Sequence, residues 1–490
     1  MKICIGYPPI KSEKGTPLLS QNRQFQWFNA PTFIYPMVPA YAATLLKEKG
    51  YDVMWEDGIA EQLSYEEWAA RCNGADIIAL ETKTPVVKKH WEIVRDLKSR
   101  YPEMAVVLMG DHVTAMPEES MQNCPVDFII TGGDYDFLLL SIVNYLSRGE
   151  ILEPGIWYRE GSSVKNTGKF VLNHDLNVLP LIDRDLTRWD LYSEHNGNYK
   201  SVPGTYTMVG RDCWYHKCRF CSWTTTYPSF RCRTPESLLD EIGILIEKYK
   251  VKSIMDDTGT FPAGEWLRTF CKGMIDRGYN RKVEIHCNMR VNALKEEDYA
   301  LMGKAGFRFL LVGMESANQK TLDRLDKGIK AEEVAQACRM AKKAGLEPHL
   351  TIMMGYPWET REDAQKTVDY AKKIFRNGWA DTLQATIMIP YPGTPLFEEC
   401  RENGWLMTED WDMYDMRSQV MKSEISDEDI KEFTRQLYKL FLTPDYVLRR
   451  LVSIRSVEDL KFIKRGVRSV IGHLTDFSNR KVRGCENENG

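Results

Sequence analysis

Short apolar runs alternate with segments of helical periodicity through the first 150 residues. The apolar runs are KICIGYP, YDVMWED, ADIIALET, AVVLMGDH and DFIITGGD, and the helical segments between them include PAYAATLLKEKG and KKHWEIVRDLKSRYP. Strands buried on both faces have continuous apolar runs. Alternation of such strands with helices predicts a parallel sheet covered by helices on both faces. We therefore expect residues 1–150 to form a doubly wound α/β domain, with ligands beyond the carboxyl ends of its strands.

A second strand–helix series occupies residues 203–400. Its six apolar runs are GTYTMVG, SIMDDTG, VEIHCNMR, FLLVGMES, HLTIMMGYP and LQATIMIPYPGTP, with helical segments such as PESLLDEIGILIEKY between them. Six such repeats predict a full or partial β/α barrel, whose reactive face is the carboxyl end of the strands. Residues 151–202 are irregular and are interpreted as a linker. Residues 401–490 are mostly helical and are expected to form a small C-terminal cap domain.

Composition narrows the classes of protein to consider. A chain of 490 residues is too long for one ordinary core. Its net charge of −4 gives no general reason to expect a nucleic-acid partner. No apolar run approaches the roughly 18 residues of a membrane span, and the opening MKICIGYPP predicts a strand rather than a signal peptide. The scattered cysteines suit a reducing interior, so we expect a cytoplasmic protein.

Only the end of the chain is locally basic, in RRLVSIRSVEDLKFIKRGVRS and then NRKVRG. A solvated helix face is the default interpretation of such a segment. A lipid-facing surface and a phosphate-binding patch are the alternatives.

Three cysteines lie within nine positions of the run RDCWYHKCRFCSW, namely Cys213, Cys218 and Cys221. A disulfide would use two of them, and a tetrahedral zinc site would need a fourth ligand. The run directly follows the first strand of the second series, which puts it on the reactive face. Thiolates favour iron–sulfur clusters or zinc, and three thiolates on a 4Fe–4S cluster leave one iron open. The basic residues Arg211, Lys217 and Arg219 would offset the negative charge of such a cluster.

The segment CWYHKCRFC resembles the cluster loop of the radical S-adenosylmethionine (SAM) enzymes. In that superfamily three cysteines bind a 4Fe–4S cluster, and SAM chelates the fourth iron. The final CRFC matches the family's Cys-x-aromatic-Cys, which implies that Phe220 lies near the adenine. The first gap holds four residues where three are usual, so His216 is a further candidate for contacting the cluster. A zinc site completed by Cys232 or Cys287 stays open as the alternative.

Later strand ends resemble the same family. In MDDTGTF an acidic segment would meet the amino group of SAM, and in HCNMRV an arginine would bind its carboxylate. VGMESANQK would approach the ribose, and MGYPWET would contact the adenine. The SAM-binding residues that the resemblance implies are Asp256, Asp257, Arg290, Glu315, Ser316, Gly355 and Pro357.

The first domain resembles the cobalamin-binding domain that precedes the barrel in one large subgroup of these enzymes. The resemblance is carried by GYPP, LMGDHVTAMPEE and VDFIITGGDYDF and covers roughly residues 1–400. It implies cobalamin contacts at the strand ends, from Tyr7, Pro8, Pro9, Glu81, Thr82, Lys83, Thr84, Gly110, Asp111, His112, Gly132 and Gly133. No Asp-x-His-x-x-Gly motif occurs, which implies cobalamin without histidine on the cobalt. GGDYDF departs from the more usual Gly-Glu-Gly-Glu, so a degenerate domain that no longer binds cobalamin is the alternative.

The resemblance implies a cobalamin-dependent radical SAM methyltransferase that methylates an unactivated carbon. Its cofactors would be a 4Fe–4S cluster, SAM and cobalamin, and its activity would require anaerobic conditions. The substrate would be a small molecule, a lipid, a peptide or a protein, and flavodoxin or ferredoxin would donate electrons. The alternatives are a radical SAM cyclase or oxidase that acts without methylation, similar to anaerobic magnesium-protoporphyrin cyclase, and a non-catalytic metal- and corrin-binding protein.

Overall fold

The first domain is built on a parallel sheet whose strand order reverses beside its first strand. The computed structural model describes residues 1–19, 25–28, 32–454 and 457–476, so the basic run at 479–484 lies outside it. The parallel strands are β1 (Lys2–Tyr7), β4 (Asp52–Asp57), β5 (Ile77–Thr82), β6 (Ala105–Gly110) and β7 (Phe128–Ile130), in the order β4-β1-β5-β6-β7. All five predicted strands are confirmed. The order reverses between β1 and β5, which is where open α/β sheets bind ligands.

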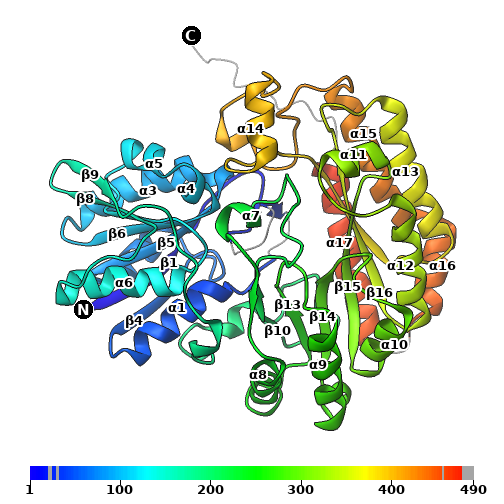
Figure 1. The fold of residues 1–490 in the computed structure, drawn as a ribbon, viewed down its shortest axis with the longest axis horizontal. Coiled ribbons are helices and arrows are strands. Elements are labelled where there is room, and N and C mark those ends of the chain that lie inside the picture. The colour runs from blue at the N-terminus through cyan, green and yellow to red at the C-terminus, as the bar shows by residue number, and fades with distance from the viewer. Residues whose placement is uncertain (20–24, 29–31, 455–456, 477–490) are drawn as a thin grey trace.

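Helices cover both faces of this sheet, as the strand–helix alternation predicts (Figure 1). α1 (Met37–Glu48) packs with α6 (Tyr135–Arg148) on one face. α2 (Tyr65–Arg71) and α3 (Val87–Arg100) are joined by a hydrogen bond from Tyr65 to Asp96. The short helices α4 (Asp111–Ala115) and α5 (Pro117–Asn123) follow β6.

The expected linker contributes two strands to the first sheet. β8 (Ile156–Glu160) pairs antiparallel with β7, and β9 (Ser163–Asn166) pairs antiparallel with β8. The hairpin gives a weak sequence signal because it is short and β9 is exposed along its whole length. A second small ribbon, β2 (Thr16–Pro17) with β3 (Trp27–Phe28), lies between β1 and α1.

The second sheet contains six parallel strands in chain order, each matching a predicted run. They are β10 (Gly204–Thr207), β13 (Ser253–Asp256), β14 (Glu284–Met289), β15 (Phe307–Glu315), β16 (Glu347–Met354) and β17 (Thr382–Ile387). The helices between them are α8 (Pro235–Glu247), α9 (Glu265–Asp276), α10 (Glu296–Lys304), α11 (Gln319–Arg324), α12 (Ala331–Lys343) and α13 (Arg361–Arg376). Within the described residues β10 and β17 are the two edges of this sheet, so the barrel is partial.

C-terminal helices complete the open side of the barrel. They are α14 (Pro395–Glu402), α15 (Asp427–Lys439), α16 (Pro444–Val452) and α17 (Val457–Asp476). α15 lies along the edge strand β17, where the Tyr438 hydroxyl accepts a hydrogen bond from the Ala385 amide (3.1 Å) and donates one to the Ala385 carbonyl (2.9 Å). An edge strand exposes backbone groups that otherwise invite pairing, and α15 satisfies those of Ala385. No helix in the described part of the chain has the length and apolar character of a membrane span.

One hydrophobic core spans the two sheets, and a second lies between the barrel strands and their outer helices. The first runs from Ile5 in the first sheet to Met353 and Met388 in the barrel. In Figure 1 the first domain and the barrel lie side by side, with α7 (Trp223–Thr226) between them. The hydroxyl of Tyr227, which follows α7, donates to the carbonyl oxygen of Gly133 across this boundary (3.0 Å).

Candidate active site

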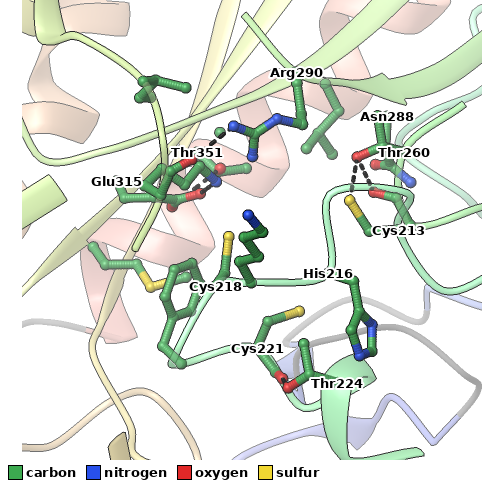
Figure 2. A pocket seen from close by; sticks show the side chains of 18 of the residues that line it. Cys213, His216, Cys218, Cys221, Thr224, Thr260, Asn288, Arg290, Glu315 and Thr351 are labelled. Atoms are coloured by element: carbon green, nitrogen blue, oxygen red, sulfur yellow. Dashed lines mark hydrogen bonds and ion pairs between the residues drawn. The ribbon is translucent and has the colours of Figure 1, made fainter. Parts of the chain in front are cut away.

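A pocket that is open to solvent lies at the carboxyl end of the barrel strands. The cysteine loop forms one wall, and the floor is formed by side chains from four adjacent strands, Asn288, Leu311, Thr351 and Gln384. Figure 2 shows the thiols of Cys213, Cys218 and Cys221 around the same space. The three cysteines therefore meet at the reactive face, as their position after the first barrel strand predicts.

Local backbone geometry gives the cysteine loop its path. The ribbon of β11 (Gly210–Arg211) and β12 (Arg231–Cys232) closes the base of the loop. Asp212 adopts a left-handed conformation (φ 73°), and its carbonyl passes so close to Gly259 that a Cβ there would lie 2.6 Å from the oxygen. Glycine at position 259 is therefore required for this approach. The Cys213 thiol lies 3.0 Å from the Thr260 hydroxyl.

His216 lines the pocket, but its Nδ1 pairs with the carboxylate of Asp212. This hydrogen bond fixes the ring within the loop itself. His216 adopts a left-handed backbone conformation (φ 50°), which accommodates the extra residue between Cys213 and Cys218. The long first gap thus forms a turn stabilised by the Asp212–His216 pair.

The positive charges beside the thiols differ from those expected. Burial raises the pKa of Cys218, while Lys327 and Arg290 oppose that rise. Of the three loop cations, Lys217 lines the pocket. Arg211 instead binds Asp134 and Asp136 of the first domain, and Arg219 pairs with Glu399 (3.1 Å). The expectation for Arg211 and Arg219 was wrong, because both side chains point away from the thiols toward buried or half-buried carboxylates.

Neither proposed zinc ligand joins the three thiols. Cys287 lies on β14 but does not line the pocket. Its side chain packs in the core beneath the outer helices. Cys232 lies on β12, opposite Gly210. Within the described residues no three His, Cys, Asp or Glu side chains are arranged to hold a single metal ion. Three soft thiolates around one pocket, with Lys327 and Arg290 beside them, fit a 4Fe–4S cluster.

Three of the residues implied to bind SAM line the pocket, namely Phe220, Arg290 and Glu315. Arg290 stacks on the Tyr215 ring, with its guanidinium carbon 3.6 Å from the ring centroid, and donates to the Lys327 carbonyl (2.7 Å). Its Nε is buried without a protein partner. A buried donor of this kind is a natural partner for a carboxylate.

The other residues implied to bind SAM do not line the pocket. The Asp256 carboxylate accepts hydrogen bonds from the backbone amides of Val209 (3.0 Å) and Thr258 (3.1 Å) and from the Thr207 hydroxyl. Its oxygens thereby join the ends of β10 and β13. Ser316 donates to Glu359 (2.7 Å) beneath the pocket. Asp257, Gly355 and Pro357 are likewise absent from the lining.

Lys327 is a pocket residue that sequence reasoning missed. Its ammonium lies 2.6 Å from Oε1 of Glu315. Burial opposes the charge on Lys327, but Glu315 and Cys218 outweigh it and raise the lysine pKa. The segment LDKG after α11 carries no motif for such a role, so only its proximity to Glu315 could have suggested it. Thr260 and Gln384 are further lining residues that the sequence did not indicate.

The edge of the first sheet contains buried polar groups where the strand order reverses. The Tyr7 hydroxyl, at the end of β1, donates to Oε2 of Glu81 on β5 (2.6 Å). Oε1 of Glu81 is buried without a partner, and burial raises the pKa of Glu81 to about 7. Nearby, Lys83 lies 3.5 Å from the Asp111 carboxylate. Thr82 interacts with His90 (3.0 Å).

Other residues implied to bind cobalamin contact protein groups in this structure. His112 interacts with Thr84 through Nδ1 (3.3 Å) and with Glu119 through Nε2 (3.0 Å). Gly132 and Gly133 lie against the rings of Phe170 and Tyr227, so that a Cβ on either glycine would come within 2.4 Å of a ring atom. A Cβ on Gly110 would likewise come too close to the Thr82 carbonyl oxygen of the neighbouring strand. Pro8 and Pro9 follow β1 at the same edge.

A model of the radical SAM superfamily matches residues 208–371. This stretch includes all three cysteines and both cations beside Cys218. Residues 208–371 are a radical SAM domain.

Two curated relatives and one solved structure show what this radical SAM protein is similar to. An uncharacterized methyltransferase of Pyrococcus horikoshii is 29% identical over 450 residues, which cover 89% of this chain and 93% of that protein. The anaerobic magnesium-protoporphyrin IX monomethyl ester cyclase of Cereibacter sphaeroides is 26% identical over 79% of this chain and 63% of its own length. The cobalamin-dependent SAM radical enzyme OxsB, solved with aqua-cobalamin and SAM, has a TM-score of 0.71 at 14% identity, covering 96% of this chain and 71% of OxsB.

The likeness to OxsB shows that the radical SAM protein shares its two-part fold, and the residues at the sheet edge bear on cobalamin itself. The buried Oε1 of Glu81 can accept a hydrogen bond from a ligand at the point of strand reversal. A ligand beside Gly132 and Gly133 would require Phe170 and Tyr227 to move. The edge therefore fits a cobalamin group near Glu81, while its glycines contact protein rings.

Proposed function

We propose that this radical SAM protein is a cobalamin-dependent methyltransferase that methylates an unactivated carbon. The observation that carries the proposal is the position of the three-thiol pocket relative to the first sheet. Thr224 of α7 lines the pocket, and α7 packs against α4, which follows β6 of the first sheet. One short helix therefore separates the pocket from the sheet edge at which a second cofactor is expected.

A bound 4Fe–4S cluster and SAM would supply a 5′-deoxyadenosyl radical, and bound cobalamin would supply the methyl group. Cys213, Cys218 and Cys221 would hold the cluster. Arg290 would bind the SAM carboxylate, with its guanidinium held in place by the Tyr215 ring and the Lys327 carbonyl. Flavodoxin or ferredoxin is the proposed electron donor.

The protein's own side chains orient the reactants and exclude water. Lys327 and Glu315 form a buried ion pair at the pocket wall, so that neither charge lacks a partner. Met353, Met388, Ile389 and Met416 line the pocket as apolar surface. Such a surface shields a carbon-centred reaction from solvent and from stray proton donors.

A cyclase or oxidase is the second candidate. The similarity to the anaerobic cyclase of Cereibacter sphaeroides extends over 79% of this chain and supports this alternative. A non-catalytic binding protein is the third candidate, and it predicts no SAM cleavage at all.

The test is anaerobic incubation of the reconstituted protein with candidate substrates and methyl-labelled SAM. A methyltransferase should place the label in the product. Cys218→Ala should lose both activities, SAM cleavage and methyl transfer. Cys232→Ala, which changes a cysteine outside the pocket, is the matched control and should keep both. Formation of 5′-deoxyadenosine with an altered but unlabelled product would favour the cyclase or oxidase. Absence of SAM cleavage by the fully reconstituted protein would contradict both enzymatic proposals.

A further inference from the structure

Exposed apolar side chains are concentrated in the last two helices. Within the described residues, nine of the 21 large hydrophobic side chains that are exposed lie between positions 442 and 471. Single exposed hydrophobic residues are ordinary, whereas a contiguous group marks an interaction surface. The nine are Leu442, Val447, Leu448, Leu451, Val452, Val457, Leu460, Val467 and Ile471.

α16 presents an apolar face to solvent while its other side is attached to the barrel. Leu448, Leu451 and Val452 are each about 60% exposed, and Leu448 lies one helical turn before the other two. On the attached side the Tyr446 hydroxyl donates to the Asp381 carbonyl (2.9 Å). Arg449 donates to the Phe375 carbonyl (2.5 Å). The outward face of α16 is therefore set by specific polar contacts on its inner side.

α17 continues this surface with a regular stripe. Val457, Leu460, Lys464, Val467 and Ile471 recur at alternating spacings of three and four, which places them on one face of the helix. All five side chains are exposed. Four residues separate α16 from α17 along the chain. We call these nine hydrophobic side chains, together with Lys461 and Lys464, the C-terminal surface.

The inner side of α17 is attached to the amino-terminal end of the barrel. Asp459 pairs with Lys200 (2.7 Å), and Arg465 donates to the Tyr199 carbonyl (2.8 Å). Both partners precede β10, and Asp381, which anchors α16, precedes β17. The pocket lies at the opposite, carboxyl end of these strands. A partner on the C-terminal surface would therefore leave the pocket mouth accessible.

Charge distinguishes among possible partners. Residues 442–490 hold ten Lys and Arg against six Asp and Glu, a net charge of +4 in a chain whose total is −4. A second copy of this chain would bring the same positive segment against itself, with Lys464 inside the apolar stripe. An anionic lipid surface instead accepts apolar side chains at the acyl boundary and lysines at the headgroups.

We propose that the C-terminal surface docks this protein on anionic membranes as a peripheral, non-spanning contact. The apolar stripe enters the interface between headgroups and acyl chains, and Lys461 and Lys464 remain at the level of the headgroups. This places the barrel on the membrane by its amino-terminal end. It is independent of which reaction the pocket catalyses.

The test is co-sedimentation of the full-length protein with vesicles of phosphatidylglycerol and phosphatidylcholine, compared with phosphatidylcholine alone. We expect binding to the anionic vesicles that weakens as salt rises, and little binding to the neutral ones. The triple variant Leu448→Gln, Leu451→Gln, Leu460→Gln should bind at least about tenfold more weakly. Its thermal midpoint should stay close to that of the wild type, since all three side chains face solvent. Ile151→Gln, which changes a 93% exposed side chain in another part of the molecule, is the matched control.

Lys461→Glu with Lys464→Glu separates charge from apolar contact and should abolish the preference for anionic vesicles. Absence of binding to anionic vesicles would overturn the proposal, as would equal loss in Ile151→Gln. Light scattering without vesicles detects self-association. A dimer that the triple variant dissociates, together with no vesicle binding, would assign the surface to a second copy and also overturn the proposal.

Discussion

At the scale of single residues, the pocket depends on side chains whose charges are placed by protein contacts rather than by solvent. Arg290 is the clearest example, since Tyr215 and the backbone of Lys327 hold its guanidinium while Nε is left for a ligand. The positive charges of Lys327 and Arg290 oppose the rise that burial causes in the pKa of Cys218. The same cations that bind ligands therefore also favour the thiolate.

Replacing Arg290 with Ala should weaken SAM binding by about 1.5–3 kcal/mol, the range for a hydrogen bond to a charged group. The measurement is SAM affinity of the reconstituted protein under anaerobic conditions. Arg277→Ala removes an exposed arginine that pairs with Asp240 on α8 and should leave SAM affinity unchanged. An unaltered dissociation constant in Arg290→Ala would remove this residue from the site.

Glu81 should make stability depend on pH in an unusual direction. Burial raises its pKa to about 7, above the ordinary value near 4.3. Between these two values the folded protein holds a proton that the unfolded chain has lost, so the free energy of unfolding falls as pH rises through this window. The loss is at most about 4 kcal/mol.

Glu81→Gln should flatten this dependence when unfolding by denaturant is compared at pH 5 and pH 8. Glu66→Gln, at a fully exposed position on α2, is the control and should keep the wild-type slope. An identical pH slope in wild type and Glu81→Gln would show that Glu81 does not hold the proton.

Histidine should not bind cobalt in this protein. Two histidines lie beside the segment from Glu81 to Thr84. His112 interacts with Thr84 and Glu119 through its two ring nitrogens, and His90 is fully buried in α3, where Nδ1 contacts Thr82. Cobalamin bound here should therefore have its lower face without nitrogen, near this segment. Electron paramagnetic resonance of the Co(II) state tests this, because an axial nitrogen would add superhyperfine splitting to the cobalt lines. Such splitting would refute the prediction.

At the scale of elements, the cluster loop is anchored to the first domain. Arg211, two residues before Cys213, reaches Asp134 (2.7 Å) and Asp136 at the start of α6. All three side chains are fully buried. The acidic residues of GGDYDF, which depart from the family's usual pattern, thus bind the base of the cysteine loop. Arg231 adds a second contact from β12 to Asp134 (2.6 Å).

Removing one partner of this buried network should be costly. Arg211→Met leaves Asp134 and Asp136 close together without their shared cation, and we expect a loss of about 3–5 kcal/mol in unfolding free energy. Denaturant unfolding measures it. Arg401→Met breaks an exposed pair with Glu398 and should cost no more than about 1 kcal/mol. Equal small losses in the two variants would contradict a structural role for the Arg211 contact.

The strands were predictable because each parallel strand is a buried apolar run, as in AVVLMGDH and FLLVGMES. The β8–β9 hairpin was not, because an exposed strand such as Ser163–Asn166 carries no apolar signal. That the three cysteines meet at the reactive face was predictable from their position after the first barrel strand. The resemblance to the family implies that Asp256 binds SAM. In the structure its carboxylate oxygens instead accept hydrogen bonds from backbone amides after β10 and in the turn after β13. The position of Lys327 in the pocket could not be predicted, because it depends on which loops meet in the fold.

At the scale of the whole molecule, one hydrophobic core spans the two sheets, and the pocket lies at the carboxyl end of the barrel strands. The C-terminal residues have two roles in this arrangement. α15 satisfies the backbone groups of Ala385 on the open edge of the barrel through Tyr438, and the C-terminal surface lies at the opposite end from the pocket. The chemistry and the proposed docking are therefore separated along the strands of the barrel.

The central claim is that Cys213, Cys218 and Cys221 hold the cluster that cleaves SAM. Its most direct test is the yield of 5′-deoxyadenosine from SAM after anaerobic reconstitution and chemical reduction. We predict formation of 5′-deoxyadenosine by the wild type and by Cys232→Ala, and none by the variant in which all three pocket cysteines are changed to Ala. A triple variant that retained a full 4Fe–4S cluster and cleaved SAM at the wild-type rate would contradict the account.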